Sequence, residues 1–247
     1  ATLIVVDCPY WDDHHIKNKY HTYPLGIIIC NDLHIITVSL KEFDYLKEFE
    51  EGKVKTFYTY KKSRFLIQIL LKTASAYLKV LNVVNEDIRK KEKILYNSTN
   101  NKHLVELLDI EKTLVYFITS LKANDVVLEK LFKGNVIMMY DEDVELLDDT
   151  MIENRQGIEM CTIYKEILSS ITDTYATIVS NNLNGVMKFL AGATIVLAIP
   201  TMISSFLGMN ISLGDFAKND YAFVAICIFS FMLALFVAYL LKKKDML

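Results

Sequence analysis

Residues 189–214 have the sequence FLAGATIVLAIPTMISSFLGMNISLG, and residues 221–241 have the sequence YAFVAICIFSFMLALFVAYLL. Neither stretch contains a charged residue. A helix that crosses a bilayer needs about 20 mainly apolar residues, whereas a buried helix of a soluble core has a shorter apolar run. The two stretches therefore predict two transmembrane helices, which we place at 186–209 and 221–241.

The segment 210–220 joins the two predicted spans, so both outer ends of this hairpin lie on the same side of the membrane. Lys188 precedes the hydrophobic core of the first span, and Lys242, Lys243 and Lys244 follow the second. Lys and Arg are enriched in cytoplasmic segments. We therefore expect the large N-terminal part and the basic tail 242–247 to be cytoplasmic and 210–220 to be external.

The 247-residue chain is 52% hydrophobic with a net charge of −3, and the part before Gly185 carries 22 basic and 27 acidic residues. A nucleic-acid-binding surface needs a basic patch, so we expect no nucleic-acid partner. The sequence has no Gly-rich phosphate loop, G-x-S-x-G or H-E-x-x-H motif. We expect neither an enzyme nor an organic cofactor.

The four cysteines are far apart and form no C-x-x-C pair, so we expect reduced thiols and neither a disulfide framework nor a zinc site; they are Cys8, Cys30, Cys161 and Cys227. The chain opens without Met in an apolar, strand-like run. We expect that it begins inside a longer protein.

The part before the spans changes from strand-like to helical patterns along the sequence. Residues 1–62 contain β-branched runs that predict strands, including a hairpin around Asn31 and Asp32. Residues 63–134 repeat apolar positions at helical spacing and predict two antiparallel helices, the second over about 102–123. Residues 135–185 predict a long stalk helix that continues into the first span, with acids at its start that suit the helix dipole. This order predicts an α+β domain.

One face of the first predicted span carries small or polar residues at heptad-like spacing. Such a stripe is either a surface for close packing between helices or the wall of a water-filled pore. The second span is almost entirely apolar, so it is expected to face lipid. A single two-helix hairpin cannot enclose a channel, so a pore requires several subunits. The stripe consists of Asn184, Met187, Ala191, Thr194, Ala198, Thr201 and Ser205.

The first span ends in PTMISSFLGMN, with Gly208, Met209 and Asn210 directly before the short outer loop. In this position the tripeptide resembles the hallmark of the CorA family of magnesium and divalent-cation transporters. The resemblance extends back through SNNLNGVMKFL to the stalk and forward to the basic tail KKKDML. It covers the strand-then-helix order of the N-terminal part more loosely.

The resemblance implies a homopentameric funnel in the cell (plasma or inner) membrane. Its cytoplasmic α/β/α domain continues into stalk helices, the first spans form an inner ring that lines the pore, and the second spans surround them. Part of the family's N-terminal domain would then be missing from this chain. In this arrangement Gly208, Met209 and Asn210 form the selectivity filter.

Magnesium holds its water tightly, so a fast pore passes the hydrated ion. Asn210, repeated around a ring, would offer amide carbonyls to the ion's waters, and Gly208 would permit a backbone geometry that other residues resist. Asn184 would form a second polar ring, with Met187 and Leu190 between as an apolar constriction that gates by dewetting. Alternatively, Thr194, Thr201 and Ser205 bond back to their own helix near Pro200.

The resemblance also implies that intracellular Mg²⁺ regulates the pore through acids at subunit contacts. By spacing from Asn210, these acids fall at Asp149, beside Asp148, and at Asp173; solvated helix surface is the alternative for each. We expect a bridging divalent cation to cancel their repulsion and favour a closed ring.

The sequence thus predicts a transporter of hydrated Mg²⁺, with Co²⁺ or Ni²⁺ as further substrates. It moves ions down their electrochemical gradient and is closed by intracellular Mg²⁺. The alternatives are a transporter of Zn²⁺ or another divalent metal from the same superfamily, and a membrane-anchored scaffold or sensor that transports nothing. The expected partners are further copies of the chain, the lipid bilayer and divalent metal ions.

Overall fold

The computed structural model describes residues 1–11, 19–30, 34–58, 60–97, 102–134, 137–210 and 221–244. The chain divides into two compact units, Ala1–Asp173 and Thr174–Leu247. The long helix α4 (Asp141–Leu207) contributes to both. The expected turn at Asn31 and Asp32 and the loop 211–220 lie outside the described residues.

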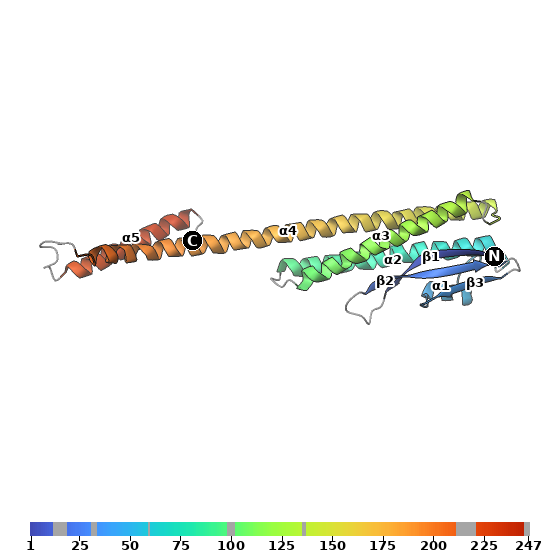
Figure 1. Ribbon diagram of the computed structural model, residues 1–247, viewed down its shortest axis with the longest axis horizontal. Helices are drawn as coiled ribbons and strands as arrows, with labels where there is room; N and C mark the ends of the chain where they lie inside the picture. The colour runs from blue at the N-terminus through green and yellow to red at the C-terminus, as the bar shows by residue number, and fades with distance from the viewer. Residues whose placement is uncertain are drawn as a thin grey trace. The chain divides into compact units, whose positions relative to one another are not determined.

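The first unit begins with an antiparallel sheet of three strands in the order β1-β2-β3 (Figure 1). The strands are β1 (Thr2–Trp11), β2 (Tyr20–Ile29) and β3 (Ile35–Ser39). Alternate residues such as Ile4, Val6 and Cys8 are buried, as a half-buried strand requires. This is the strand-first order that the sequence predicts.

Three helices follow the sheet: α1 (Asp44–Glu50), α2 (Lys62–Asn97) and α3 (Lys102–Lys133). Helices α2 and α3 pack on the sheet face that carries Ile4 and Val6, while Leu3 and Val38 on the other face are exposed. The described residues therefore form two of the three layers implied by an α/β/α domain. Helix α1 was not anticipated, and α3 continues ten residues beyond the helix expected over about 102–123.

Asn124 of α3 joins the helical layer to the sheet through its side-chain amide. It accepts a hydrogen bond from the Asp7 N–H and donates one to the Asp7 carbonyl, each 2.8 Å long. The side chain is 5% exposed, so both groups of Asp7 have exchanged water for this amide. Tyr77 of α2 donates a further hydrogen bond to the same carbonyl at 3.2 Å.

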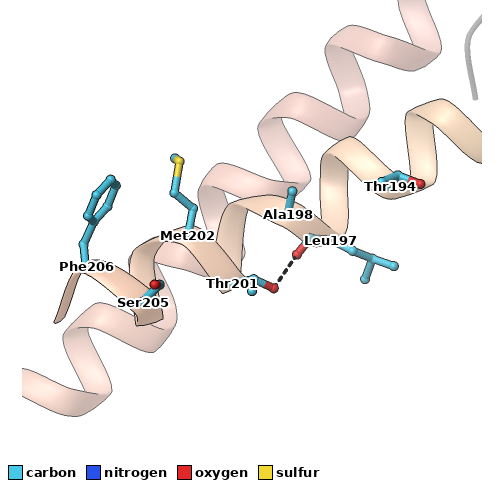
Figure 2. Close-up of a pocket in the computed structure, with 7 residues that line it drawn as sticks. All are labelled: Thr194, Leu197, Ala198, Thr201, Met202, Ser205 and Phe206. Carbon is cyan, nitrogen blue, oxygen red and sulfur yellow. Dashed lines mark hydrogen bonds between the residues drawn. The ribbon is translucent and has the colours of Figure 1, made fainter. Parts of the chain in front are cut away.

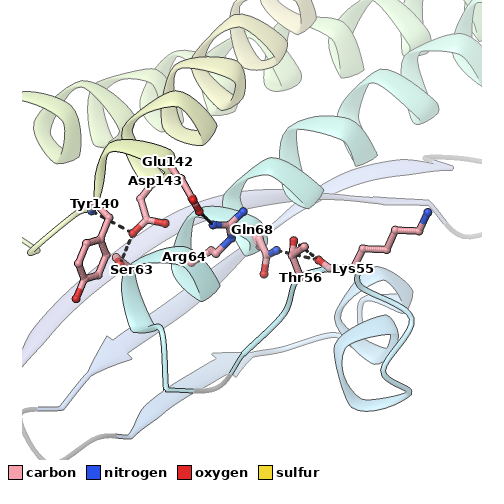
Figure 3. Close-up of polar contacts among 8 residues, drawn as sticks. All are labelled: Lys55, Thr56, Ser63, Arg64, Gln68, Tyr140, Glu142 and Asp143. Carbon is pink, nitrogen blue, oxygen red and sulfur yellow. Dashed lines mark hydrogen bonds and ion pairs between the residues drawn. The ribbon is translucent and has the colours of Figure 1, made fainter.

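Two contacts with α2 hold the first turn of α4 (Figure 3). The Ser63 hydroxyl donates to the buried carboxylate of Asp143 at 2.7 Å, and Arg64 Nη1 lies 2.6 Å from Glu142 Oε2. Asp143 also accepts the Tyr140 N–H at 3.3 Å, so it caps its own helix. Farther along, Asn154 donates to the Leu121 carbonyl at 3.0 Å and joins α4 to α3.

Within the described ranges, three helices are long and apolar enough to cross a membrane: α2, α4 and α5 (Ala222–Lys243). They differ in how much of the most apolar stretch is buried, which is 56% in α2 but 6% in α4 and 11% in α5. The apolar residues of α2 are used by the core of the first unit. The apolar stretches of α4 and α5 are largely left exposed by the described residues, as expected of surfaces that meet lipid or other subunits.

We expect Asn124→Ala to lower the free energy of unfolding of the first unit by about 2–3 kcal/mol, because it leaves two buried backbone groups of Asp7 short of partners. Asn154→Ala removes one hydrogen bond and should cost about 1 kcal/mol. The control Asn182→Ala changes an exposed side chain and should have no effect. Urea denaturation of the full chain in detergent, followed by circular dichroism, measures the free energy of unfolding of each variant. Equal effects of the three variants would contradict the role of Asn124.

Candidate functional site

The candidate site lies on one face of α4 in the second unit, where small and polar side chains line an open groove of about 560 Å³ (Figure 2). Four residues of the predicted stripe line it, and the apolar neighbours Leu197, Met202 and Phe206 complete it. Sequence analysis missed these three because it followed one heptad-like series of positions along the helix. The stripe residues in the groove are Thr194, Ala198, Thr201 and Ser205.

The other predicted pore residues lie outside this groove, nearer the start of the second unit. Asn184, Met187, Leu190 and Ala191 are all exposed on α4. Met187 and Leu190 are 58% and 52% exposed, so two large apolar side chains lie on the helix surface and are not buried by the part of the chain that the structure describes. This face is available for contact with other copies of the helix or with an enclosed pore.

The hydroxyl groups of this helix donate to its own backbone. Thr194 Oγ1 donates to the Leu190 carbonyl at 2.7 Å, and Thr201 Oγ1 donates to the Leu197 carbonyl at 3.0 Å. Ser204, where the sequence suggested Ser205, donates to the Pro200 carbonyl at 2.9 Å. Each hydroxyl proton is thus satisfied without water, while the oxygen keeps its lone pairs as acceptors.

Helix α4 ends at Leu207, directly before the predicted filter residues. The Gly208 N–H still donates to the Ser204 carbonyl at 3.0 Å, and the Met209 N–H donates to the Phe206 carbonyl at 3.4 Å. Asn210 is exposed at the end of this turn. Among the described residues, none buries Asn210, which follows closely on the end of α4.

The expectation that Gly208 supplies an unusual backbone geometry is wrong. Among the described residues, positive φ angles occur at Gly52 and Thr56, and Gly208 has none. The chain continues the helical hydrogen-bonding pattern through Gly208, so a right-handed conformation suffices. A Cβ atom at this position would lie 3.4 Å from the Ser204 carbonyl oxygen. This distance is an ordinary van der Waals contact, so neither a left-handed turn nor a steric clash requires glycine here.

Helix α5 runs beside the end of α4 (Figures 1 and 2). Its buried residues are Ser230 and Ala234, one turn apart, as in membrane helices that pack closely through small side chains. On α4 the buried small residue of this region is Gly192, while Thr194, Ala198 and Thr201 stay exposed. The stripe therefore does not serve as a packing face within one chain.

The predicted regulatory acids lie apart on α4. Asp148, Asp149 and Asp173 are all exposed. Asp149 and Asp173 are separated by roughly 36 Å of helix, at 1.5 Å per residue. The described residues contain no group of three or more His, Cys, Asp or Glu side chains that could hold a metal ion. Asp149 and Asp173 of one chain therefore cannot share an ion.

A protein-family model described as the CorA-like Mg²⁺ transporter protein matches residues 1–243. Among curated proteins, the chain is similar to the cobalt/magnesium transport protein CorA of Methanocaldococcus jannaschii. The two are 27% identical over 251 residues, which cover 98% of this chain and 76% of that protein.

Among solved structures, the complete CorA magnesium transporter from Methanocaldococcus jannaschii matches with a TM-score of 0.84 and 25% identity. The match covers 96% of this chain and 74% of that one. The full-length CmaX protein matches with a TM-score of 0.69 and 12% identity over 95% of this chain and 73% of its own, which is a likeness of fold alone.

Alanine substitutions at three glycines test the geometry of α4. Gly157→Ala would bring a Cβ to 3.2 Å from Leu121 Cδ1, so we expect it to destabilise the first unit by about 1–2 kcal/mol. Gly185→Ala meets open space and should leave stability unchanged or raise it by about 0.5–1 kcal/mol. Gly208→Ala should leave the melting temperature in detergent unchanged. A Gly208→Ala protein that fails to fold would contradict the backbone described here.

Proposed function

This chain belongs to the family of CorA-like Mg²⁺ transporters, and from that premise we propose that it is a channel-like transporter of hydrated Mg²⁺. Five copies surround a pore lined by the polar face of α4. The large N-terminal unit and the basic tail are cytoplasmic, and the pore crosses the plasma or inner membrane. Co²⁺ is a further substrate, in keeping with the named activity of the similar archaeal protein.

The observation that carries this proposal is the exposed polar face of α4 that leads to Asn210. Exposed hydroxyl and amide groups are costly in hydrocarbon. A ring of α4 helices would turn this face toward water and would leave the apolar surfaces of α5 for lipid. Because one hairpin cannot enclose a pore, the same argument requires several subunits.

The chemistry of the face suits an ion that keeps its water. The first-shell waters of Mg²⁺ bind the ion through oxygen and point their hydrogens outward, so the pore wall must accept hydrogen bonds. Thr194 and Thr201 have already given their protons to carbonyls of the helix, and their oxygens are left as acceptors. Asn210 adds side-chain carbonyls at the outer mouth. The exposed Met187 and Leu190 form the apolar constriction.

The membrane potential is sufficient to drive uptake without ATP. Moving a charge across 100 mV is worth about 2.3 kcal/mol, so a divalent cation gains about 4.6 kcal/mol on entry. Flow must then be limited by a gate. We propose that cytoplasmic Mg²⁺ closes the ring by binding between subunits at Asp148, Asp149 and Asp173. Their exposure and their separation along α4 favour ligands from neighbouring chains.

Asn210→Ala should reduce Mg²⁺ flux into proteoliposomes to the level of protein-free vesicles, because the mouth loses its acceptors for hydrated cations. The matched control Asn182→Ala removes an exposed amide from the same helix away from the stripe and should keep full flux. Flux measured with Mg²⁺, Co²⁺, Ni²⁺ and Zn²⁺ separates the metal preferences. Normal flux through Asn210→Ala would exclude the proposed filter, and no flux of any metal through the unmodified protein would favour a scaffold or sensor.

Replacing Asp148 and Asp149 together by Asn should weaken inhibition by Mg²⁺ on the cytoplasmic side. We expect the inhibitory Mg²⁺ concentration to rise by about tenfold, a coupling of ordinary size. Asp173→Asn tests the second position separately. Asp141→Asn, an exposed acid at the start of the same helix, is the control and should leave inhibition unchanged. Unaltered inhibition in both test variants would leave these acids as solvated helix surface.

A further inference from the structure

The outward face of α3 carries a stripe of exposed residues at spacings of three and four residues. Every member is exposed, and the stripe lies opposite the buried face with Leu114, Phe117 and Leu121. Its four apolar members are accompanied by lysines and by no acid. We call it the α3 stripe; it consists of Val105, Leu108, Lys112, Val115, Thr119, Lys122, Val126, Lys130 and Lys133.

The part of α4 in the first unit carries a second stripe with the same spacing and the opposite charge. It lies opposite the buried face with Asn154, Gly157 and Cys161, and again every member is exposed. Its charged members are all acids, and its two large apolar members, Ile152 and Ile163, are 56% and 52% exposed. We call it the α4 stripe; it consists of Glu145, Asp149, Ile152, Gln156, Glu159, Ile163, Glu166, Ser170 and Asp173.

One register along the helices brings parts of the two stripes together as pairs of opposite charge or as apolar pairs. Within one subunit α3 and α4 are antiparallel, and Leu121 lies at the height of Gly157, whose Cβ would come within 3.2 Å of Leu121 Cδ1. Rotation about an axis parallel to the helices keeps these heights. In this register Val105 lies opposite Asp173, Leu108 opposite Ser170, Thr119 opposite Glu159 and Lys122 opposite Gln156. At four further positions a neighbouring α4 beside the α3 stripe would place opposite charges together or apolar residues together. The resulting pairs are Lys112 with Glu166, Val115 with Ile163, Val126 with Ile152, and Lys133 with Glu145.

We propose that the α3 stripe of one subunit packs against the α4 stripe of the next, so that the cytoplasmic units form a closed ring. Two different surfaces make a head-to-tail contact, which closes into a ring when the rotation fits. Two copies of the same stripe would bring like charges together, which disfavours a two-fold dimer through either one. This inference rests on the proposed ring of subunits and adds which surfaces join it. Asp149 and Asp173 belong both to the α4 stripe and to the proposed ion site, and neither is opposite a lysine of the α3 stripe in this register.

The lysines of the α3 stripe can exchange their ion pairs within the helix for ion pairs with a neighbouring subunit. Lys112 Nζ lies 3.4 Å from Asp109 Oδ1 and Lys133 Nζ lies 3.2 Å from Glu129 Oε2, both within one exposed helix surface. Exposed ion pairs of this kind contribute little to stability. Exchanging them for contacts with a neighbouring acid, beside newly covered apolar groups, strengthens the attraction because water is excluded.

Disulfide cross-linking of the full chain in detergent tests the register. Cys30 and Cys227 are first replaced by Ser; Cys8 and Cys161 stay because burial raises the pKa of these thiols to about 11 and about 12, which keeps them unreactive. Val115→Cys and Ile163→Cys are then combined in one chain. Within that chain the two cysteines lie on surfaces that point away from each other. We expect oxidation to give a ladder of covalent multimers that ends at the size of the ring.

The matched control combines Val115→Cys with Ile152→Cys, which lies eleven residues, or roughly 16 Å, off the register. A disulfide needs Cα atoms within about 7 Å, so this pair should remain uncross-linked. In the Val115→Cys, Ile163→Cys background, Lys112→Glu should lower the yield of multimers several-fold, and Glu166→Lys added to it should restore the yield.

Native mass spectrometry of the same samples separates the two proposals. The stripe contact would be overturned if a ring forms but the test pair gives no more covalent multimers than the control pair, or if Glu166→Lys does not restore the yield of multimers. Either result would leave the proposed transport function standing. A single chain or a two-fold dimer would overturn both the ring and the contact.

Discussion

A hydrocarbon layer can neither solvate a divalent cation nor satisfy an exposed hydroxyl or amide, and this constraint explains how the second unit is built. Helix α4 meets part of it alone, since Thr194, Thr201 and Ser204 donate their protons to its own carbonyls. The oxygens of those groups still need a polar environment. A lone α4–α5 hairpin exposes them, whereas a ring of hairpins gives them water on the inside. The proposed assembly thus follows from the residues that α4 exposes.

The first unit faces the same requirement to satisfy polar groups, but within a single chain. Asn124 bonds both backbone groups of Asp7, and the buried Asp143 accepts from Ser63 and from the Tyr140 N–H. These contacts hold α3 on the sheet and the first turn of α4 on α2. The long helix that carries the polar face therefore begins at a fixed point of the core of the first unit. An ion bound between neighbouring subunits near Asp148 would act close to that point.

The features that could be predicted from sequence are those carried by local patterns. The spans are uninterrupted charge-free stretches, the strands precede the helices, and the Gly208-Met209-Asn210 tripeptide led to the CorA family, which the family model confirms. Helix α1 was missed because it has seven residues and no side-chain cap at its start. The expectation for Gly208 was wrong because the backbone after Leu207 continues in a right-handed turn. The register between Leu121 and Gly157 depends on tertiary packing, so no local pattern could reveal the complementary stripes. The pore and regulatory residues remain predictions.

The most direct measurement of the central claim is an electron cryomicroscopy structure of the full chain in lipid nanodiscs at a resolution that shows side chains. We predict a ring of α4 helices inside a ring of α5 helices, with the Asn210 amides directed at a common axis that holds water. A solitary hairpin, or an assembly whose Asn210 side chains face lipid, would contradict the account.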